Sequence, residues 1–327
     1  MHIELLEILR CPLTGQRLVL KDPVYRDGQV YSAILVSEDG ECGYSVRDFI
    51  PRFVQESNYA DNFGMQWNRF RQTQLDSYSG HPISADRFWK ATGWRAEDIA
   101  GHWVLDAGCG AGRFAEPALQ AGAKVVALDF SGAVDACFAN LRHHSNLHVV
   151  QGDIYALPLL KKFFPFVYSL GVLQHTPNVA KAFAALPVMV AEGGRLCADF
   201  YWRRLQSMLH TKYLLRPITK RLPQQSLFSV LEKIVPSLLK TSRFFGSVPF
   251  AGRYLKRLVP VADYTGIYPL DMRQLEEWAL LDTFDMLGPQ YDTPQSADTI
   301  TNWMMNAGLN NVEVLQANLL VVRGVKR

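Results

Sequence analysis

VLDAGCGAGR, residues 104–113, is a run of buried-strand character that leads directly into three closely spaced glycines. Because glycine has no β-carbon, a ligand can approach the bare backbone here, and the N–H groups that open the following helix face that ligand. A dinucleotide-binding loop would have the spacing GxGxxG, whereas this loop reads GxGxG with Asp106 two positions before its first glycine. Asp106 would repel a pyrophosphate, so the loop favours a ligand that carries a cationic amine and no phosphate.

The residues around this loop alternate between strand and helix patterns as far as residue 201. Helical spacing occurs at 113–121 and from Ser131 to about residue 143, and the strand-like runs are 102–107, 124–129, 147–151, 164–170 and 194–201. Such alternation predicts a parallel sheet. Two further strand-like runs, 311–316 and 318–323, are joined by almost no loop, which makes them an antiparallel pair. The sequence therefore predicts an α/β, Rossmann-like fold whose sheet is mostly parallel.

Acidic residues also follow the next two strands. Asp129 ends the run 124–129, about 20 residues after the glycines, where a carboxylate accepts hydrogen bonds from ribose hydroxyls. Asp153 follows the run 147–151 and can accept a hydrogen bond from the exocyclic amine of an adenine. Together with Asp106, these residues place hydrogen-bond acceptors at three strand ends. The set suits an adenosine that carries an amino acid.

These motifs resemble the class I S-adenosylmethionine-dependent methyltransferases of the small-molecule type, over roughly residues 100–327. The pieces that carry the resemblance are DAGCGAG (106–112), VVALDFS (125–131), QGDIYALP (151–158), SLGVLQHTP (169–177) and EGGRL (192–196). The resemblance implies a seven-stranded sheet with an antiparallel last strand, and S-adenosylmethionine as the cofactor. The implied contacts are Asp106, Gly108 and Gly110 to the methionine part, Asp129 to the ribose, and Asp153 and Ile154 to the adenine. We expect Phe130, Leu170 and Trp67 to border the cofactor as well.

Methyl transfer from a sulfonium is an in-line displacement, and a base is needed only where the acceptor must lose a proton. His175 is the candidate base, because it follows the fourth strand, where open α/β sheets place their ligands. The alternative is that His175 caps the next helix or packs under the cofactor. Some related quinone O-methyltransferases hold a divalent metal near this loop with acidic residues. Leu170 and Gln174 stand there in this sequence, so we expect no metal.

An aromatic segment precedes the glycine loop, and its residues 59–67 resemble the N-terminal lid of small-molecule methyltransferases, within an expected lid and linker region 56–100. Tyr59, Phe63 and Trp67 are four residues apart and therefore share one helical face, which could cover the cofactor. Core packing is the alternative for these rings. We expect the acceptor pocket to be lined by other aromatic residues, with structural packing again the alternative; the candidates, together with Tyr59, are Tyr201, Tyr264, Tyr268 and Tyr291.

Residues 1–55 form a separate unit in the sequence. LLEILRCP (5–12) and GYSVRDFIP (43–51) resemble the small zinc-ribbon domain of tRNA-methyltransferase activator proteins. A structural zinc site needs four ligands, commonly from two CxxC pairs. Here Thr14 replaces the second cysteine after Cys11, and the second pair retains only Cys42. We therefore expect a degenerate ribbon without metal that serves as a scaffold or contacts a partner.

Residues 202–270 are an insertion into the methyltransferase-like region 101–327. Residues 203–262 contain twelve basic side chains and one acidic one, Glu232, although the whole chain has a formal charge of only +3. Apolar residues recur there at helical spacing, which predicts amphipathic helices broken at Pro217, Pro223 and Pro236. Three interpretations are open: contact with an anionic membrane surface, a lid that recognises an anionic acceptor, or a solvated helical cap. No recognisable RNA-binding module accompanies the charge, which disfavours nucleic acid as a partner.

The composition of the 327 residues, 48% hydrophobic and 20% charged, is that of an ordinary globular protein. The longest apolar stretch, 182–191, is too short for a transmembrane span, the N-terminus lacks a basic start, and five scattered cysteines fit a reducing compartment. We expect a cytoplasmic S-adenosylmethionine-dependent methyltransferase, either free or peripheral on the inner membrane surface. Its expected acceptor is a small molecule, such as a lipid-linked compound, a sugar or a secondary metabolite, that is anionic or held at a membrane surface. A cofactor-binding adaptor without activity and an RNA-modifying enzyme are the alternatives. The oligomeric state stays open.

Overall fold

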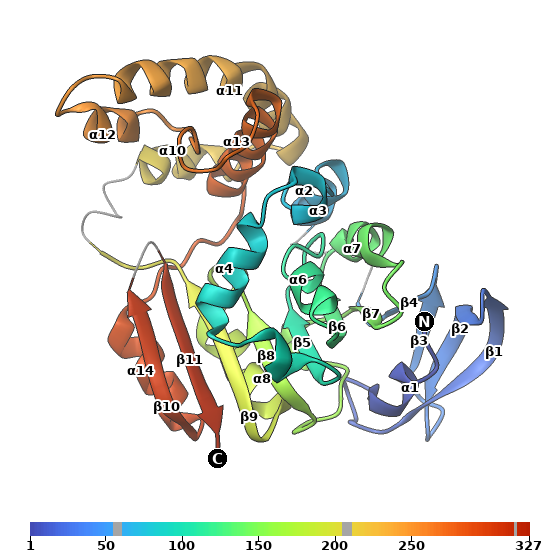
Figure 1. Cartoon of the computed structure of the whole chain (residues 1–327). Coiled ribbons are helices and arrows are strands. Elements are labelled where there is room, and N and C mark those ends of the chain that lie inside the picture. Colours follow the sequence, from blue (N-terminus) through green and yellow to red (C-terminus); the bar gives the residue numbers. More distant parts are fainter. Residues whose placement is uncertain (55–60, 205–210, 317–318) are drawn as a thin grey trace.

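The structure is a computed structural model that describes residues 1–54, 61–204, 211–316 and 319–327; the side chains of residues 61–63 and 253 are likewise left out. Tyr59 and the side chain of Phe63, two residues of the expected lid, therefore lie outside the described residues. Over the described residues the backbone forms one sheet of 11 strands. Helices lie on both faces of the sheet, and a helical cap lies above the carboxyl ends of its parallel strands (Figure 1).

The parallel part of the sheet confirms the strand alternation read from the sequence. It consists of β5 (Trp103–Ala107), β6 (Lys124–Asp129), β7 (Leu147–Gln151), β8 (Phe164–Ser169) and β9 (Val190–Phe200), in the order β7-β6-β5-β8-β9. The C-terminal pair, β10 (Leu309–Gln316) and β11 (Leu320–Lys326), continues the sheet. β11 runs antiparallel to both β9 and β10, as the expected antiparallel last strand does.

The sheet is larger than the seven strands that the sequence resemblance implies. Four N-terminal strands, β1 (Leu18–Arg26), β2 (Gln29–Ser37), β3 (Gly43–Arg47) and β4 (Ile50–Arg52), form an antiparallel meander. β4 then pairs in parallel with β7 at Arg52 and Gln151, so the meander extends the central sheet. Among the described residues, no group of three or more histidine, cysteine or acidic side chains is arranged to hold a metal ion.

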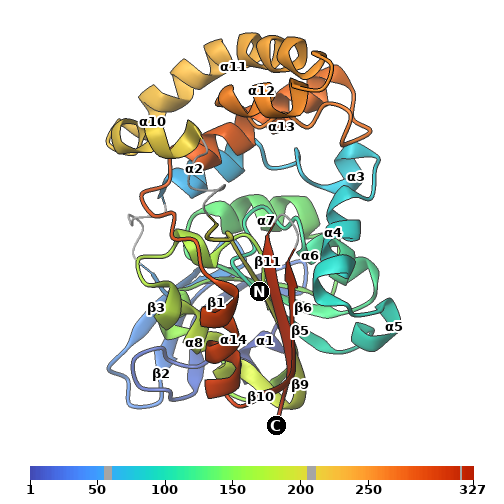
Figure 2. The same ribbon diagram turned by 90° about the vertical axis from the view of Figure 1, so that its left-hand side faces the viewer.

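Side chains of successive strand residues point to opposite faces, which creates two cores. In β6, Val126 and Leu128 pack with α1 (Leu5–Ile8), α8 (Val179–Met189) and α14 (Ala297–Asn306). Val125 and Ala127 pack on the other face, which is covered by α4 (Ile83–Thr92), α5 (Ala96–Ile99), α6 (Ala115–Gln120) and α7 (Ala133–Leu141). Figure 2 shows the two helical layers on either side of the strands.

The cap lies above the carboxyl ends of the parallel strands and is built from α10 (Thr211–Thr219), α11 (Gln224–Gly246), α12 (Gly252–Leu255), η3 (Lys256–Leu258) and α13 (Met272–Leu287). It has a core of its own, in which Leu231 and Val235 of α11 meet Phe284 of α13. α13 begins with a capping box in which Asp271 and Gln274 bond each other's backbone N–H. None of the helices that the structure describes combines the length and apolar character needed to cross a membrane.

Of the three prolines at which the sequence predicts a helix break, only one lies between helices. Pro223 precedes α11, but Pro217 lies in the last turn of α10 and Pro236 lies within the 23 residues of α11. The residues beside Pro236 explain its position, since Val235 and Leu239 are buried against α13. Packing of this apolar face stabilises the helix enough to outweigh one missing backbone hydrogen bond.

Candidate cofactor and acceptor site

A cavity of about 610 Å³ lies between the carboxyl ends of the strands and the cap. Its floor is made of the glycine loop, the ends of β6 and β8 and the loop after β7, while its roof comes from α2 (Asp61–Arg69), α10 and α13. One continuous space therefore joins the expected cofactor residues to residues of the cap.

The glycine loop fills the floor of this cavity with bare backbone. Gly108 and Gly110 have φ angles of +98° and +52°, which side chains other than glycine rarely adopt. A β-carbon on Gly108 would lie 2.3 Å from Cγ2 of Val172, and one on Gly110 would lie 3.3 Å from the ring of Trp67. A β-carbon on Gly112 would reach Leu141 of α7. Gly112 therefore serves helix packing, while Gly108 and Gly110 keep the cavity floor open.

Gly108→Ala is expected to destabilise the protein and to remove cofactor binding. The methyl group must displace Val172, and the backbone conformation resists any side chain. We expect the free energy of unfolding, measured by urea denaturation, to fall by about 3 kcal/mol or more. Gly122→Ala is the matched control, because Gly122 also has a positive φ but nothing lies within 4 Å of its β-carbon. Equal losses in the two variants would show that the contact with Val172 has no weight.

Asp129 lies at the edge of the floor and is held by three donors. Its carboxylate accepts hydrogen bonds from the backbone N–H of Gly110 at 2.9 Å and from the N–H and hydroxyl of Ser131 at 2.9 and 2.7 Å. Burial raises the pKa of this carboxyl, and the hydrogen bonds oppose the rise. Ser131 positions Asp129 and also accepts a hydrogen bond from the N–H of Ala133, the first residue of α7, at 3.2 Å. Asp129 and the neighbouring Phe130 both line the cavity.

Two of the acidic residues expected at the cofactor do not line the cavity. Asp106 is buried beneath the glycine loop, where its Oδ2 makes no hydrogen bond to any group in the described part of the chain. Asp153 is the N-cap of η1 (Ile154–Ala156) and accepts a hydrogen bond from the N–H of Tyr155 at 2.8 Å. Ile154 does line the cavity, as do Leu170 and Trp67. The bare glycine backbone, the Asp129 carboxylate and the apolar walls of the cavity together fit an adenosine with an amino-acid tail.

The buried position of Asp106 predicts a pH dependence of stability. Burial raises the pKa of this carboxyl to about 8, and the nearby Asp129 adds to the rise while the Tyr168 hydroxyl opposes it. An unfolded chain releases this proton near pH ~4, so between these values unfolding releases a proton and stability falls as the pH rises. Asp282, whose pKa burial raises to about 6, acts in the same direction only below that pH.

We therefore expect the ligand-free protein to lose up to about 1.4 kcal/mol of unfolding free energy per pH unit from pH ~6 to ~8. Asp106→Asn keeps the shape of the side chain without the ionisation and should show a flatter profile. Urea denaturation at three pH values measures both profiles. Parallel profiles for the two proteins would contradict a protonated Asp106.

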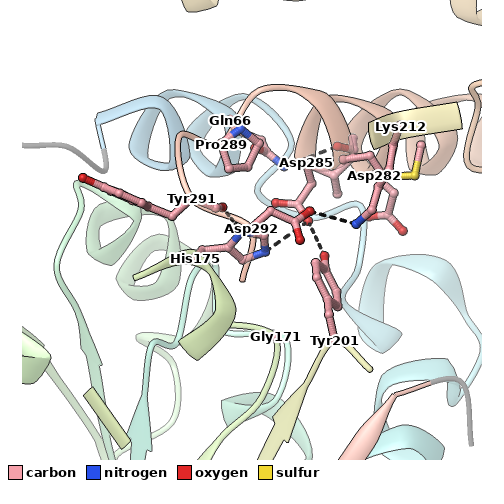
Figure 3. Close-up of polar contacts among 12 residues, drawn as sticks. Gln66, Gly171, His175, Tyr201, Lys212, Asp282, Asp285, Pro289, Tyr291 and Asp292 are labelled. Atoms are coloured by element: carbon pink, nitrogen blue, oxygen red, sulfur yellow. Dashed lines mark hydrogen bonds and ion pairs between the residues drawn. The ribbon is translucent and has the colours of Figure 1, made fainter. Parts of the chain in front are cut away.

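His175 faces the cavity from η2 (Leu173–His175), directly after β8. Its Nδ1 lies 3.1 Å from the carbonyl oxygen of Tyr291. A carbonyl only accepts, so Nδ1 carries a hydrogen, and Nε2 is the basic nitrogen of the neutral ring. Nε2 lies 3.9 Å from the carboxylate of Asp285, which also accepts a hydrogen bond from the hydroxyl of Tyr201 at 3.5 Å (Figure 3).

The acceptor side of the cavity contains polar residues that no sequence motif indicated. Asp282 of α13 accepts hydrogen bonds from the Tyr264 hydroxyl, from Nε1 of Trp278 at 3.2 Å and from Nε2 of Gln74 at 2.9 Å. Arg113 donates to the side-chain oxygen of Gln74 at 2.9 Å, and burial lowers the pKa of its guanidinium to about 10. The roof and floor are thus joined by a buried network of hydrogen bonds.

A second cation, Arg87 of α4, fixes the loop that bears His175. Arg87 pairs with Asp199 of β9 at 2.7 Å, and the other oxygen of Asp199 accepts from the N–H of Gly171 at 2.5 Å. The side chain of Asp199 is 1% exposed, so a buried carboxylate ties α4 to the loop after β8. Arg87 itself reaches the cavity wall.

The predicted acceptor tyrosines divide into two groups. Tyr201, Tyr264 and Tyr268 line the cavity, and the rings of Tyr264 and Tyr268 stack with centroids 4.8 Å apart. Tyr291 contributes its backbone carbonyl to His175 and does not line this cavity. Tyr59 falls outside the described residues.

Residues 105–198 match a family model described as a methyltransferase domain. The chain is 32% identical over 133 residues to a tRNA U34 carboxymethyltransferase of Pseudoalteromonas translucida, which is 37% of this chain and 41% of that protein. It is 36% identical over 95 residues to a malonyl-[acyl-carrier protein] O-methyltransferase of Pectobacterium atrosepticum, 29% of this chain and 37% of that protein. It is 31% identical over 118 residues to a demethylmenaquinone methyltransferase of Thermobifida fusca, 35% of this chain and 50% of that protein.

The chain thus spans half or less of the length of these curated relatives. The residues of the family match include the glycine loop, Asp129 and His175, whereas the cap lies outside them. The match indicates a methyltransferase domain over residues 105–198, which supports S-adenosylmethionine as the cofactor.

Proposed function

We propose that this protein transfers the methyl group of S-adenosylmethionine to a small-molecule acceptor that binds under the cap. The observation that carries the proposal is that one continuous cavity is bounded by the glycine loop and Asp129 at one end and by His175 and Tyr264 at the other. A cofactor on the loop and an acceptor under the roof would therefore share one space. The acid-rich, hydrogen-bonding roof favours an acceptor with a hydroxyl or amino group.

A few residues around the cavity would carry out this reaction. When bound, S-adenosylmethionine would supply a methyl carbon on a sulfonium. An acceptor lone pair would bond to that carbon while the carbon–sulfur bond broke and left both electrons on sulfur. Asp129 holds the ribose hydroxyls, and the bare backbone of Gly108 and Gly110 admits the amino-acid part. His175 takes the acceptor's proton on Nε2, while the Tyr291 carbonyl holds the ring in the required tautomer.

We further propose a small-molecule acceptor and a cytoplasmic location. The cap roofs the cavity with half-buried side chains, which suits a small or chain-like acceptor better than a folded RNA. All five cysteines are unbonded thiols, which supports a reducing compartment such as the cytoplasm.

Sorting of a transferred label tests the proposal. The purified chain is incubated with a source-cell extract and S-adenosylmethionine labelled on the methyl group, and the lipid, aqueous small-molecule, RNA and protein fractions are counted. Label in either small-molecule fraction is the expected result. Label in RNA alone would replace the proposed acceptor class, and binding of S-adenosylhomocysteine without labelling of any fraction would make the chain an adaptor.

A further inference from the structure

The basic residues of the insertion do not gather around the acceptor space. Of those within 203–262 whose side chains are described, Lys212 is the one that lines the cavity, and it already pairs with Asp292 at 2.8 Å. Arg216 is buried and donates to the carbonyl oxygens of Met286 and Pro289. The exposed basic residues of the cap within 211–262 are Lys220, Arg221, Lys233, Lys240 and Arg257. The charge of the insertion is therefore directed outward, which removes the interpretation of a lid that clamps an anionic acceptor.

The outward face of α11 combines this charge with exposed apolar side chains. Val230, Ile234 and Phe244 are 52%, 41% and 69% exposed, and at 100° per residue they share a sector of about 120° with Lys233 and Lys240. The buried residues of α11 lie on the opposite side of the helix and face α13. In both overall views α11 is the outermost element of the cap (Figures 1 and 2).

The one acidic residue of the insertion does not disturb this face. Glu232 points to the flank of α11 and forms an ion pair with Arg69 of α2 at 2.5 Å. Its charge is therefore matched from outside the insertion. The face of α11 that carries Lys233 and Lys240 is left with positive charge alone.

The other cap segments repeat the pattern. Leu214 and Ile218 of α10 are exposed and four residues apart, with Lys220 and Arg221 directly after them. The hydroxyl of Thr211 donates to the carbonyl of Arg257, which brings the start of α10 beside η3. Additional exposed apolar side chains of the cap are Leu222, Val248, Phe250, Tyr254 and Leu258. Of the 21 large apolar side chains that are exposed over the described residues, 10 lie within 214–258.

We propose that the outer face of the cap, residues 214–258, docks in the plane of an anionic lipid bilayer. A helical cap that served only as a solvated cover would not expose this many leucine, isoleucine and phenylalanine side chains. Apolar side chains that enter the headgroup region, flanked by lysines and arginines that meet anionic headgroups, are the features of peripheral membrane helices. Because no described helix can span a bilayer, the contact is peripheral.

The docking surface lies on the same element that roofs the acceptor cavity. α10 presents Leu214 and Ile218 outward and Lys212 and Tyr213 to the cavity. Docking would therefore hold the cavity next to the bilayer, where an acceptor with a hydrocarbon chain would be supplied. This consequence rests on the proposed function, whereas docking itself does not require a methyl acceptor.

Sedimentation with lipid vesicles tests the proposal on the full chain. Vesicles of phosphatidylcholine alone are compared with vesicles that contain about one third phosphatidylglycerol, at low and at high salt. We expect at least about fivefold more protein on the anionic vesicles at low salt, and a loss of this excess at high salt. Equal binding to both vesicle types, or binding to neither, would overturn the proposal.

Variants locate the surface. Phe244→Ser with Phe250→Ser removes exposed rings, Lys233→Glu with Lys240→Glu reverses exposed charge, and each pair should lower binding to anionic vesicles by at least about fivefold. Tyr25→Ser with Lys90→Glu is the matched control away from the cap and should bind as the unaltered chain does. Unchanged affinity for S-adenosylhomocysteine shows that each variant is folded. A second copy as the occupant, seen as a doubled mass in solution that Phe244→Ser abolishes, would overturn the lipid assignment.

Discussion

Asp129→Ala is expected to weaken the affinity for S-adenosylhomocysteine by about tenfold to a hundredfold. The carboxylate is fixed at the cavity edge by Gly110 and Ser131, so its free lone pairs are already aimed at a ligand. Loss of hydrogen bonds from two ribose hydroxyls to a charged acceptor accounts for this range. Isothermal titration calorimetry of the ligand-free protein measures the change.

Two further variants separate the ribose contact from a distorted loop. Asp129→Asn keeps one carbonyl oxygen and should lose less affinity than the alanine variant. Ser131→Ala keeps the carboxylate but removes one of its donors, so the expected loss is only a few-fold. An Asp129→Ala protein with affinity within twofold of the original would show that the ribose is held elsewhere.

His175→Ala is expected to lower the rate of methyl transfer by about a hundredfold to a thousandfold while affinity for S-adenosylhomocysteine stays within about twofold. Nε2 faces the acceptor side next to Asp285, whereas the cofactor residues lie at the other end of the cavity. The measurement is the initial rate of labelling of whichever fraction the unaltered protein labels, together with calorimetry.

Tyr201→Phe is the control for His175. Tyr201 packs edge-on against the His175 ring with centroids 5.4 Å apart, and its hydroxyl reaches Asp285. Removal of that hydroxyl should cost no more than about tenfold in rate, because the base is retained. A His175→Ala protein that keeps its rate, or that loses cofactor affinity to the same extent, would make His175 a structural residue.

The parallel sheet and the glycine loop under the cavity could be predicted because they depend on local patterns. The apolar runs 124–129 and 147–151 predict the bounds of β6 and β7 as the structure has them. The glycines stand where the backbone of one loop has positive φ angles. Asp153 shows the limit of local reasoning, because a carboxylate just after a strand can also bond a nearby backbone N–H. Its Oδ1 accepts from the N–H of Tyr155, and the expected contact with an adenine stays a prediction.

The acceptor side could not be predicted, because it is assembled from distant segments. Asp282 and Gln74 are separated by 208 residues and meet only when α13 folds over the floor. Likewise, the count of basic residues in the insertion carries no information on which side of each helix they occupy. In the folded cap Val235 is buried and its neighbour Ile234 is exposed, which shows which side of α11 faces outward. The lysines of α11 lie on the same side as Ile234.

The pairing of β4 with β7 also protects the sheet from self-association. Without it, β7 would end the sheet with unpaired backbone groups, which favour edge-to-edge aggregation. Arg52 covers this edge with hydrogen bonds to Gln151 and Asp135, and the N–H of Phe53 donates to the Gln151 carbonyl. The outermost strand on that side is then β1, whose pairing with β2 is interrupted by irregularities near Pro23. The N-terminal meander thus replaces an edge that invites further strands with one that resists them.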